Sequence, residues 1–318
     1  MIVLSRIRLG VAWALLQVPL LLGWSTSALA QSEEPTKQVK SSVDRVLTLM
    51  AFTVVPDLTA SVLSFDGGSA GQARLGMTQI GGGMTLKSKY PIYLEGSLAY
   101  MNYDPSFVIP GYSQEQSSAN WSSLSATGGV GWDFEVLPNL VFRPILNVAY
   151  GHLSSDLQLP SPLLRGTANP EIDFLDNGTL NAYGLGGSLM LDYTLEKMDK
   201  SVDLELRYTH ITLKPFNSQK VVSGSALAET VSVYGRYRAP IGVTFLDRPV
   251  RYVLEAASTV YLGDQRDALG FNYLSSIGAG IELDWSATND WISKSRIVGR
   301  YAFGENVQGF AISVALSF

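Results

Sequence analysis

Hydrophobic and polar residues alternate along most of this chain from residue 58 onward. In the C-terminal segment every second residue is apolar: Phe310, Ile312, Val314, Leu316 and Phe318. Residues 271–285 alternate in the same way. A period of two predicts β-strands with one apolar and one polar face, because an α-helix would distribute such residues around its whole axis.

The same pattern predicts about twelve strands, most of them as long as the 9–11 residues that a tilted membrane strand needs. The predicted strands are 58–65, 74–87, 90–103, 120–136, 140–153, 179–195, 201–213, 227–243, 250–262, 271–285, 291–303 and 307–318. No apolar run after the first 30 residues is long enough for a membrane-spanning helix.

The connections between these strands alternate in length. The short set is 88–89, 137–139, 196–200, 244–249 and 287–290. The long set is 66–73, 104–119, 154–178, 214–226 and 263–270, and 304–306 is a short exception. Short turns on one side and long loops on the other are typical of an all-β, antiparallel up-and-down transmembrane barrel. An even number of strands places both chain ends on the periplasmic side.

Charged residues within the strands fall mostly on the face opposite the apolar one. We expect them to face the lumen: Glu95, Asp133, Glu135, Arg143, Asp192, Asp203, Glu205, Arg207, Arg236, Arg238, Arg251, Glu255, Glu282, Asp284, Lys294, Arg296 and Arg300. A basic side chain facing the bilayer midplane would cost about 2–4 kcal/mol. The pattern therefore predicts a polar interior along every strand.

Aromatic residues on the apolar face gather near the strand ends. Beside the short turns these are Trp132, Phe134, Phe142, Tyr193, Trp285 and Trp291. Near the long loops they are Tyr100, Trp121, Tyr150, Tyr208, Tyr261 and Phe271. Two aromatic girdles are typical of a membrane barrel and are not expected of a soluble sheet.

Two segments precede the predicted barrel of residues 58–318. Residues 1–30 have a basic start, a short apolar stretch and an Ala28–Ala30 cleavage motif, which predict a secretory leader. Residues 31–57 begin as a polar stretch, and apolar residues at helical spacing from Val39 to Met50 predict a short amphipathic helix. This helix could fill the lumen, lie on a membrane surface or form a periplasmic tail. Its few basic residues favour plug or tail over surface binding.

Composition excludes several classes of function. The chain has 318 residues, a formal net charge of -5 and no cysteine, and 46% of its residues are hydrophobic but only 16% charged. Zinc sites built on cysteine and disulfides are impossible, and an acidic chain does not fit nucleic-acid binding. We expect no metal and no cofactor.

Few residues suggest catalysis. His152 and Asp156 lie at the outer end of one strand, near where outer-membrane proteases keep a His/Asp pair, but a histidine of the aromatic girdle is the favoured interpretation. His210 is interpreted in the same way. Residues 67–71 match G-x-S-x-G in letters only, because the motif needs a strand-to-helix elbow. No outward pairing of serine and histidine at one level stands out.

The alternating residues that end in Phe318 are similar to the C-terminal signal of bacterial outer-membrane proteins, which the barrel-assembly machinery takes up. Twelve strands after a helical segment look like the translocator barrel of autotransporters. Only about 27 residues separate Ala30 from the first predicted strand, so the chain resembles the solitary autotransporter-like barrels of Gram-negative bacteria, which lack a passenger. The resemblance implies an integral outer-membrane protein that contacts lipid and the assembly machinery.

These observations favour a monomeric, non-enzymatic barrel with a surface, structural or contact role. The main alternative is a small-solute, porin-like channel lined by the inward charges. An outer-membrane protease or lipase is the weakest alternative.

Overall fold

The computed structural model describes residues 47–48, 50–52, 54, 61–65, 74–86, 89–104, 106–107, 117–118, 121–155, 178–216, 224–246, 248–266, 271–285 and 294–317. The predicted leader, the polar residues 31–42, Asp156, residues 67–71, Trp291 and Phe318 lie outside these ranges. No helix among the described residues has the length and apolar character needed to cross a bilayer.

Antiparallel strands make up nearly all of this part of the chain. They are β1 (Ser61–Phe65), β2 (Arg74–Thr85), β3 (Ile92–Asp104), β4 (Ser106–Phe107), β5 (Ser117–Ser118), β6 (Trp121–Trp132), β7 (Phe134–Leu137), β8 (Leu140–Ser155), β9 (Thr179–Lys197), β10 (Lys200–Phe216), β11 (Ala226–Phe245), β12 (Arg248–Tyr261), β13 (Tyr273–Asp284), β14 (Lys294–Gly304) and β15 (Val307–Ser317).

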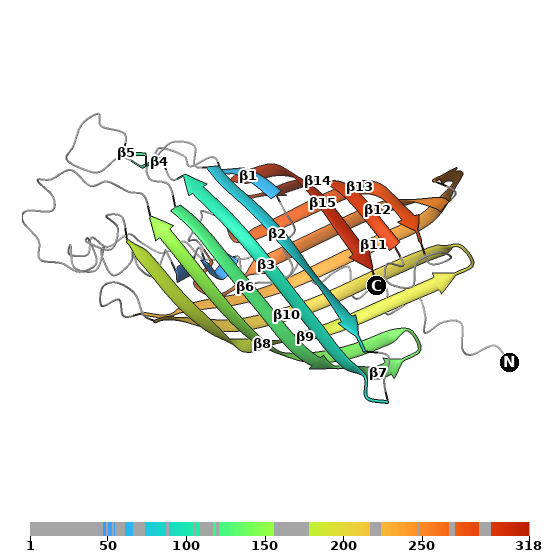
Figure 1. The fold of residues 1–318 in the computed structure, drawn as a ribbon, viewed down its shortest axis with the longest axis horizontal. Helices are drawn as coiled ribbons and strands as arrows, with labels where there is room; N and C mark the ends of the chain where they lie inside the picture. Colours follow the sequence, from blue (N-terminus) through green and yellow to red (C-terminus); the bar gives the residue numbers. More distant parts are fainter. Residues whose placement is uncertain are drawn as a thin grey trace, which may run out of the picture. The chain divides into compact units, whose positions relative to one another are not determined.

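The strand order closes on itself. From β8 to β15 each strand pairs with the next, β1 pairs with both β15 and β2, β2 pairs with β3, and β3 with β6. The β6–β8 pairing completes a ring of twelve strands, with β7 continuing the line of β6. Figure 1 shows β1 between β2 and β15 and the long strands running side by side around the barrel, whereas β4 and β5 form a separate pair. The predicted antiparallel barrel is confirmed.

Alternation along each strand separates two faces. On β8 the even residues Leu146 and Val148 are 69% and 52% exposed, whereas Ile145 and Asn147 are 4% and 0% exposed. Because strand side chains point alternately to the two sides, the first pair faces outward and the second pair faces the lumen.

Most strands lie within a few residues of their predicted bounds, and the structure adds two features that the prediction lacks. The predicted strand 120–136 is interrupted at Asp133, whose N–H donates to the carbonyl oxygen of Pro91 at 3.0 Å. The predicted loop 104–119 contains the short pair β4 and β5. The first strand is described only from Ser61 to Phe65.

Candidate functional site

The residues described in the N-terminal segment are helical and buried. Leu47, Thr48, Met50, Ala51, Phe52 and Val54 are each at most 2% exposed. The apolar members pack in one cluster with inward side chains of the barrel wall, among them Met77, Met101, Trp121, Leu153, Leu180, Ile211, Leu213 and Val307. All these wall residues lie toward the strand ends that lead into the long connections and the Gly304–Val307 turn. We call this the long-loop end.

Three aromatic side chains hold the helical residues to the wall. The ring of Phe52 lies 4.7 Å from that of Tyr261 and 5.9 Å from that of Phe271. Tyr261 and Phe271 are each 1% exposed, and Trp121 is 9% exposed in the same cluster. The assignment of Trp121, Tyr261 and Phe271 to the outer girdle is therefore wrong. They serve the packing of the helical segment instead.

Polar side chains of the wall and of one long connection bind backbone carbonyls of the helical segment. Gln265 is fully buried, donates its amide to the oxygen of Ala51 at 2.9 Å, and accepts the N–H of Glu229 at 3.1 Å. Thr127 donates its hydroxyl to the oxygen of Val54 at 2.9 Å. Carbonyls at the end of a helix lack partners within the helix, and buried ones need a donor elsewhere. Thr127 on β6 and Gln265, in the connection after β12, supply these donors.

The lumen at the long-loop end is therefore apolar, which corrects the prediction of a polar interior along every strand. The signal was present in the sequence. Leu153 and Leu213 occupy inward positions near their strand ends, and an apolar residue facing a water-filled lumen would have nothing to pack against.

Toward the short turns, the lumen is crossed by hydrogen-bonded charges. Arg207 on β10 binds Glu95 on β3 through two hydrogen bonds of 2.8 and 2.7 Å. Three strands, β6, β8 and β9, lie between β3 and β10 in the ring. The Arg207–Glu95 ion pair therefore bridges the lumen. Asn147 donates to Glu95 at 2.7 Å, and Ser188 joins Asn147 to Arg207. We call Glu95 and Arg207 the crossbar.

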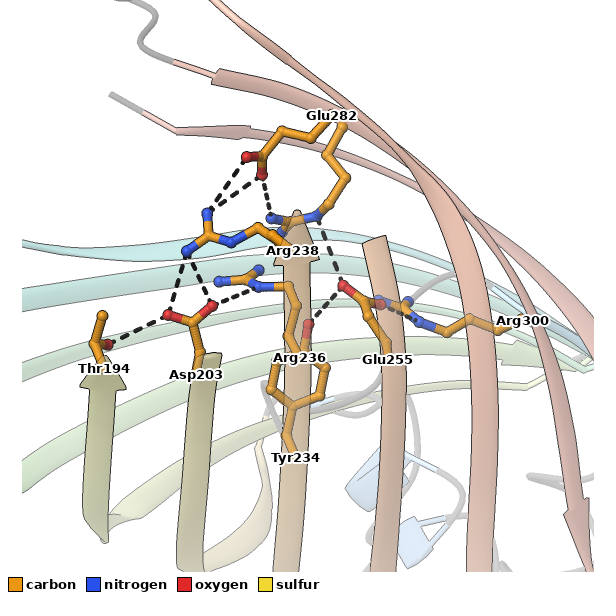
Figure 2. A network of polar contacts seen from close by, with 9 residues as sticks. Thr194, Asp203, Tyr234, Arg236, Arg238, Glu255, Glu282 and Arg300 are labelled. Atoms are coloured by element: carbon orange, nitrogen blue, oxygen red, sulfur yellow. Dashed lines mark hydrogen bonds and ion pairs between the residues drawn. The ribbon is translucent and has the colours of Figure 1, made fainter. Parts of the chain in front are cut away.

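A second network follows the wall from β9 to β14 (Figure 2). Asp203 accepts hydrogen bonds from Thr194, Arg236 and Arg238. Arg238 also lies 3.3 Å from Glu282, which is fully buried and which Arg296 binds at 3.3 Å.

Glu255 closes the same network through Tyr234, Arg296 and Arg300. Tyr234 donates its hydroxyl to Glu255 at 2.6 Å, and Arg300 forms an ion pair with the same carboxylate. The network thus joins four arginines to three carboxylates, with one excess positive charge. Buried charges are stable only when paired and hydrogen-bonded, and here each carboxylate has several donors.

Arg143 organises a third cluster. Its guanidinium forms an ion pair with Asp133, lies 3.2 Å from Asp192, and stacks 3.9 Å from the ring centre of Tyr93. Thr85 donates to Asp133 at 2.7 Å. The break between β6 and β7 occurs at the residue whose carboxylate meets Arg143.

The remaining predicted charges lie at the edges of these clusters. Arg251 is 3.8 Å from Asp284, and Glu205 and Lys294 are half-buried. Glu135 is exposed, like the rest of β7.

Outward residues of two regions bear on function. Phe310, Ile312 and Val314 of β15 are 72%, 68% and 73% exposed, whereas Phe318 and the side chain of Leu316 lie outside the described residues. His152 is half-buried on the outer face, and His210 lies 3.7 Å from Glu229. The sequence analysis did not identify Asn181, which lies on β9 and contacts His152. Within the described part of the chain, no cluster of residues suits a metal ion.

Residues 58–157 match the autotransporter β-domain family. The chain forms an autotransporter-like β-barrel. Barrels of this kind are integral to the bacterial outer membrane, and this location accounts for the outward apolar residues. No curated protein sequence matches the chain significantly.

Solved structures to which the chain is similar include three autotransporter barrels. The β-domain of Bordetella BrkA is 13% identical, with a TM-score of 0.48, over 81% of this chain and 96% of that one. The translocator domain of NalP from Neisseria meningitidis is 11% identical, with a TM-score of 0.44, over 88% and 95%. The transport unit of AIDA-I from Escherichia coli is 10% identical, with a TM-score of 0.45, over 91% and 100%.

Proposed function

We propose that this outer-membrane barrel is closed along its lumen and acts through the connections it displays, in a structural or contact role. The observation that carries this proposal is the complete burial of the helical residues Leu47, Met50, Ala51 and Val54 among wall side chains. A lumen packed in this way leaves no path for a solute. Long connections then face the cell exterior, and both chain ends face the periplasm.

The crossbar supplies a second barrier in series with the helical segment. Its two charges come from β3 and β10, which are four positions apart in the ring of twelve strands, and their side chains are 2% and 4% exposed. Opening the lumen at this level would separate a buried ion pair, which costs about 3–5 kcal/mol when one partner is lost. We therefore propose that removal of the helical segment alone leaves the barrel closed.

Single-channel conductance in planar bilayers tests both barriers. We compare the wild type, a deletion of residues 31–57, the double variant Glu95→Ala/Arg207→Ala, and the deletion combined with the double variant. We expect steady current only from the combined protein. Arg251→Ala/Asp284→Ala serves as the matched control, because this pair joins neighbouring strands and its loss should add no current to the deletion.

Two results would contradict this proposal. Steady current through the wild type would favour a porin-like channel lined by the charged clusters. Full current from the deletion alone would show that the helical segment is the single barrier in the wild type and that the crossbar blocks no current.

We also propose that the exposed apolar residues of β15 are read by the barrel-assembly machinery and then face lipid. Their exposure, with polar or small residues between them, fits both contacts. The barrel would act as a monomer.

A further inference from the structure

A histidine, two serines and an asparagine gather on the outer face at the long-loop end. His152 and Ser154 are two residues apart on β8, so both point outward with the exposed Tyr150. Asn181 of β9 lies opposite His152 in the register, and Ser122 of β6 lies opposite Ser154.

Asn181 orients the imidazole of His152. Its side-chain oxygen lies 2.8 Å from Nδ1 of His152 and accepts the hydroxyl of Tyr150 at 3.1 Å. An amide oxygen only accepts hydrogen bonds, so Nδ1 must carry the proton. In a neutral imidazole with this tautomer, Nε2 carries the lone pair that a general base needs.

Ser154 stands beside this base. Strand residues two apart have Cα atoms about 6.6 Å from each other, a distance that an imidazole and a serine side chain together can span. The hydroxyl of Ser154 lies 2.7 Å from the hydroxyl of Ser122. Rotation about χ1 moves a serine hydroxyl along the strand, and catalytic hydrogen bonds commonly tighten only when substrate binds. Ser122 provides a donor next to the nucleophile.

The surrounding aromatic residues indicate the depth of the site in the membrane. The ring of Phe216 lies 6.0 Å from those of Tyr150 and Tyr183, and all three are between 39% and 45% exposed on the outer face. Aromatic girdles lie at the level of the lipid headgroups. The ester bonds of membrane lipids lie close to this level.

We propose that Ser154, His152 and Asn181 form a membrane-facing acyl-hydrolase site whose substrate is a carboxylic ester of an outer-leaflet lipid. This activity is independent of the closed lumen, because none of these residues faces it. Ser154 is the nucleophile, His152 the general base and acid, and Asn181 a positioning residue.

The reaction is a two-step acyl transfer. Oγ of Ser154 attacks the ester carbonyl carbon while its proton moves to Nε2 of His152, and the hydroxyl of Ser122 donates to the oxyanion. The intermediate collapses, the C–O bond to the alcohol breaks, and His152 returns the proton to the leaving alkoxide. Water, deprotonated by His152, then attacks the acyl-serine and releases a fatty acid and free Ser154.

Fatty-acid release by the full-length folded protein tests this proposal. We use mass spectrometry with two lipid preparations, phosphatidylethanolamine vesicles and vesicles containing lipid A. Release from the first alone assigns a glycerophospholipid, release from the second alone assigns the lipid A ester, and release from both assigns the shared ester chemistry. A fluorophosphonate probe should label Ser154 in each case.

Variants separate the proposed site from the rest of the outer face. Ser154→Ala and His152→Ala should lower the rate at least about a hundredfold, the usual scale of general acid–base catalysis. Asn181→Ala should lower it less, and Asn181→Asp, which keeps an acceptor, should restore most of it. Ser258→Ala is the matched control, because Ser258 and Ser275 form a similar outward pair at 2.9 Å on strands without histidine.

The proposal fails if folded protein releases no fatty acid from either preparation and Ser154 is not labelled. It also fails if release survives Ser154→Ala, or is lost in His210→Ala but not in His152→Ala. Heat-dependent mobility on gels shows that each variant is folded, so loss of the barrel is not mistaken for loss of the site.

Discussion

At the scale of single residues, a glycine makes the crossbar possible. A Cβ at position 129 on β6 would lie 2.7 Å from Cγ of Glu95 and 2.6 Å from Nδ2 of Asn147. Glu95 must pass over β6 to reach Asn147 and Arg207, and only glycine leaves it the space. The glycine therefore decides whether a carboxylate on β3 can neutralise an arginine on β10.

We expect Gly129→Val to destabilise the barrel by about 3–5 kcal/mol, because Arg207 would lose a buried partner. The free energy of unfolding is measured from urea titrations in lipid vesicles, followed by tryptophan fluorescence. Gly82→Val is the control, since a Cβ at position 82 meets nothing within 4 Å. Equal stability of the two variants would contradict the role given to Gly129.

At the scale of elements, the strands and the turns obey different constraints. Each strand must satisfy lipid on one face and the lumen on the other, whereas each short turn must reverse the chain. Asn139, Met198 and Leu246, in three of these turns, have positive φ angles of 68°, 56° and 53°. Asparagine tolerates a positive φ angle, whereas the same conformation strains methionine or leucine by about 1–2 kcal/mol.

Met198→Gly should therefore stabilise the β9–β10 hairpin by up to about 1 kcal/mol, with part of the relieved strain offset by the greater freedom of glycine when unfolded. Met198 is 96% exposed, so the substitution removes little packing. The same urea titration measures the change. Asn139→Gly should be nearly neutral, and a larger gain there than at Met198 would contradict this explanation.

The lipid face of β15 gives a second test at this scale. Val314→Lys should reduce the fraction of assembled barrel, because a basic residue that faces the hydrocarbon costs up to about 2–4 kcal/mol. Gln308→Lys lies on the same face of the same strand but beside the Gly304–Val307 turn, and should be tolerated. Heat-dependent gel mobility of membrane fractions measures assembly. Equal assembly of the two variants would contradict the assigned depth.

At the scale of the whole molecule, the lumen is divided into two layers. Apolar side chains and the helical segment fill the long-loop end, and the paired charges cross it toward the short turns. Each layer suits its occupant, because an apolar helix needs apolar walls while buried charges need partners of opposite sign. Among the described residues, an apolar layer at the long-loop end is therefore followed by a layer of paired charges toward the short turns.

This division predicts a specific cross-link. A Cβ at Gly151 would lie 2.7 Å from Cε of Met50, so Met50→Cys/Gly151→Cys should react with a short bifunctional thiol reagent in the membrane-inserted protein. The natural chain has no cysteine, so these two thiols are the only ones present. Mass spectrometry of peptides detects the product. Met50→Cys/Gly82→Cys is the control and should not cross-link, and failure of the first pair in folded protein would contradict the position of the helix.

The sequence by itself determined the antiparallel barrel, the approximate strands and the two faces of each strand. It could do so because lipid contacts every strand directly, and the period of two records that contact residue by residue. It also contained the inward apolar residues such as Leu153, although their meaning depended on knowing what packs against them.

Only the tertiary structure decided which inward residues meet. Glu95 and Arg207 are 112 residues apart in the chain, and their contact depends on the stagger of five strands around a closed ring. The same holds for Phe52 with Tyr261 and for His152 with Asn181. Alternation specifies whether a residue faces the lumen or the outside. Closure of the barrel sets its position along the barrel axis and the residues beside it, and each of these contacts depends on that position and those neighbours.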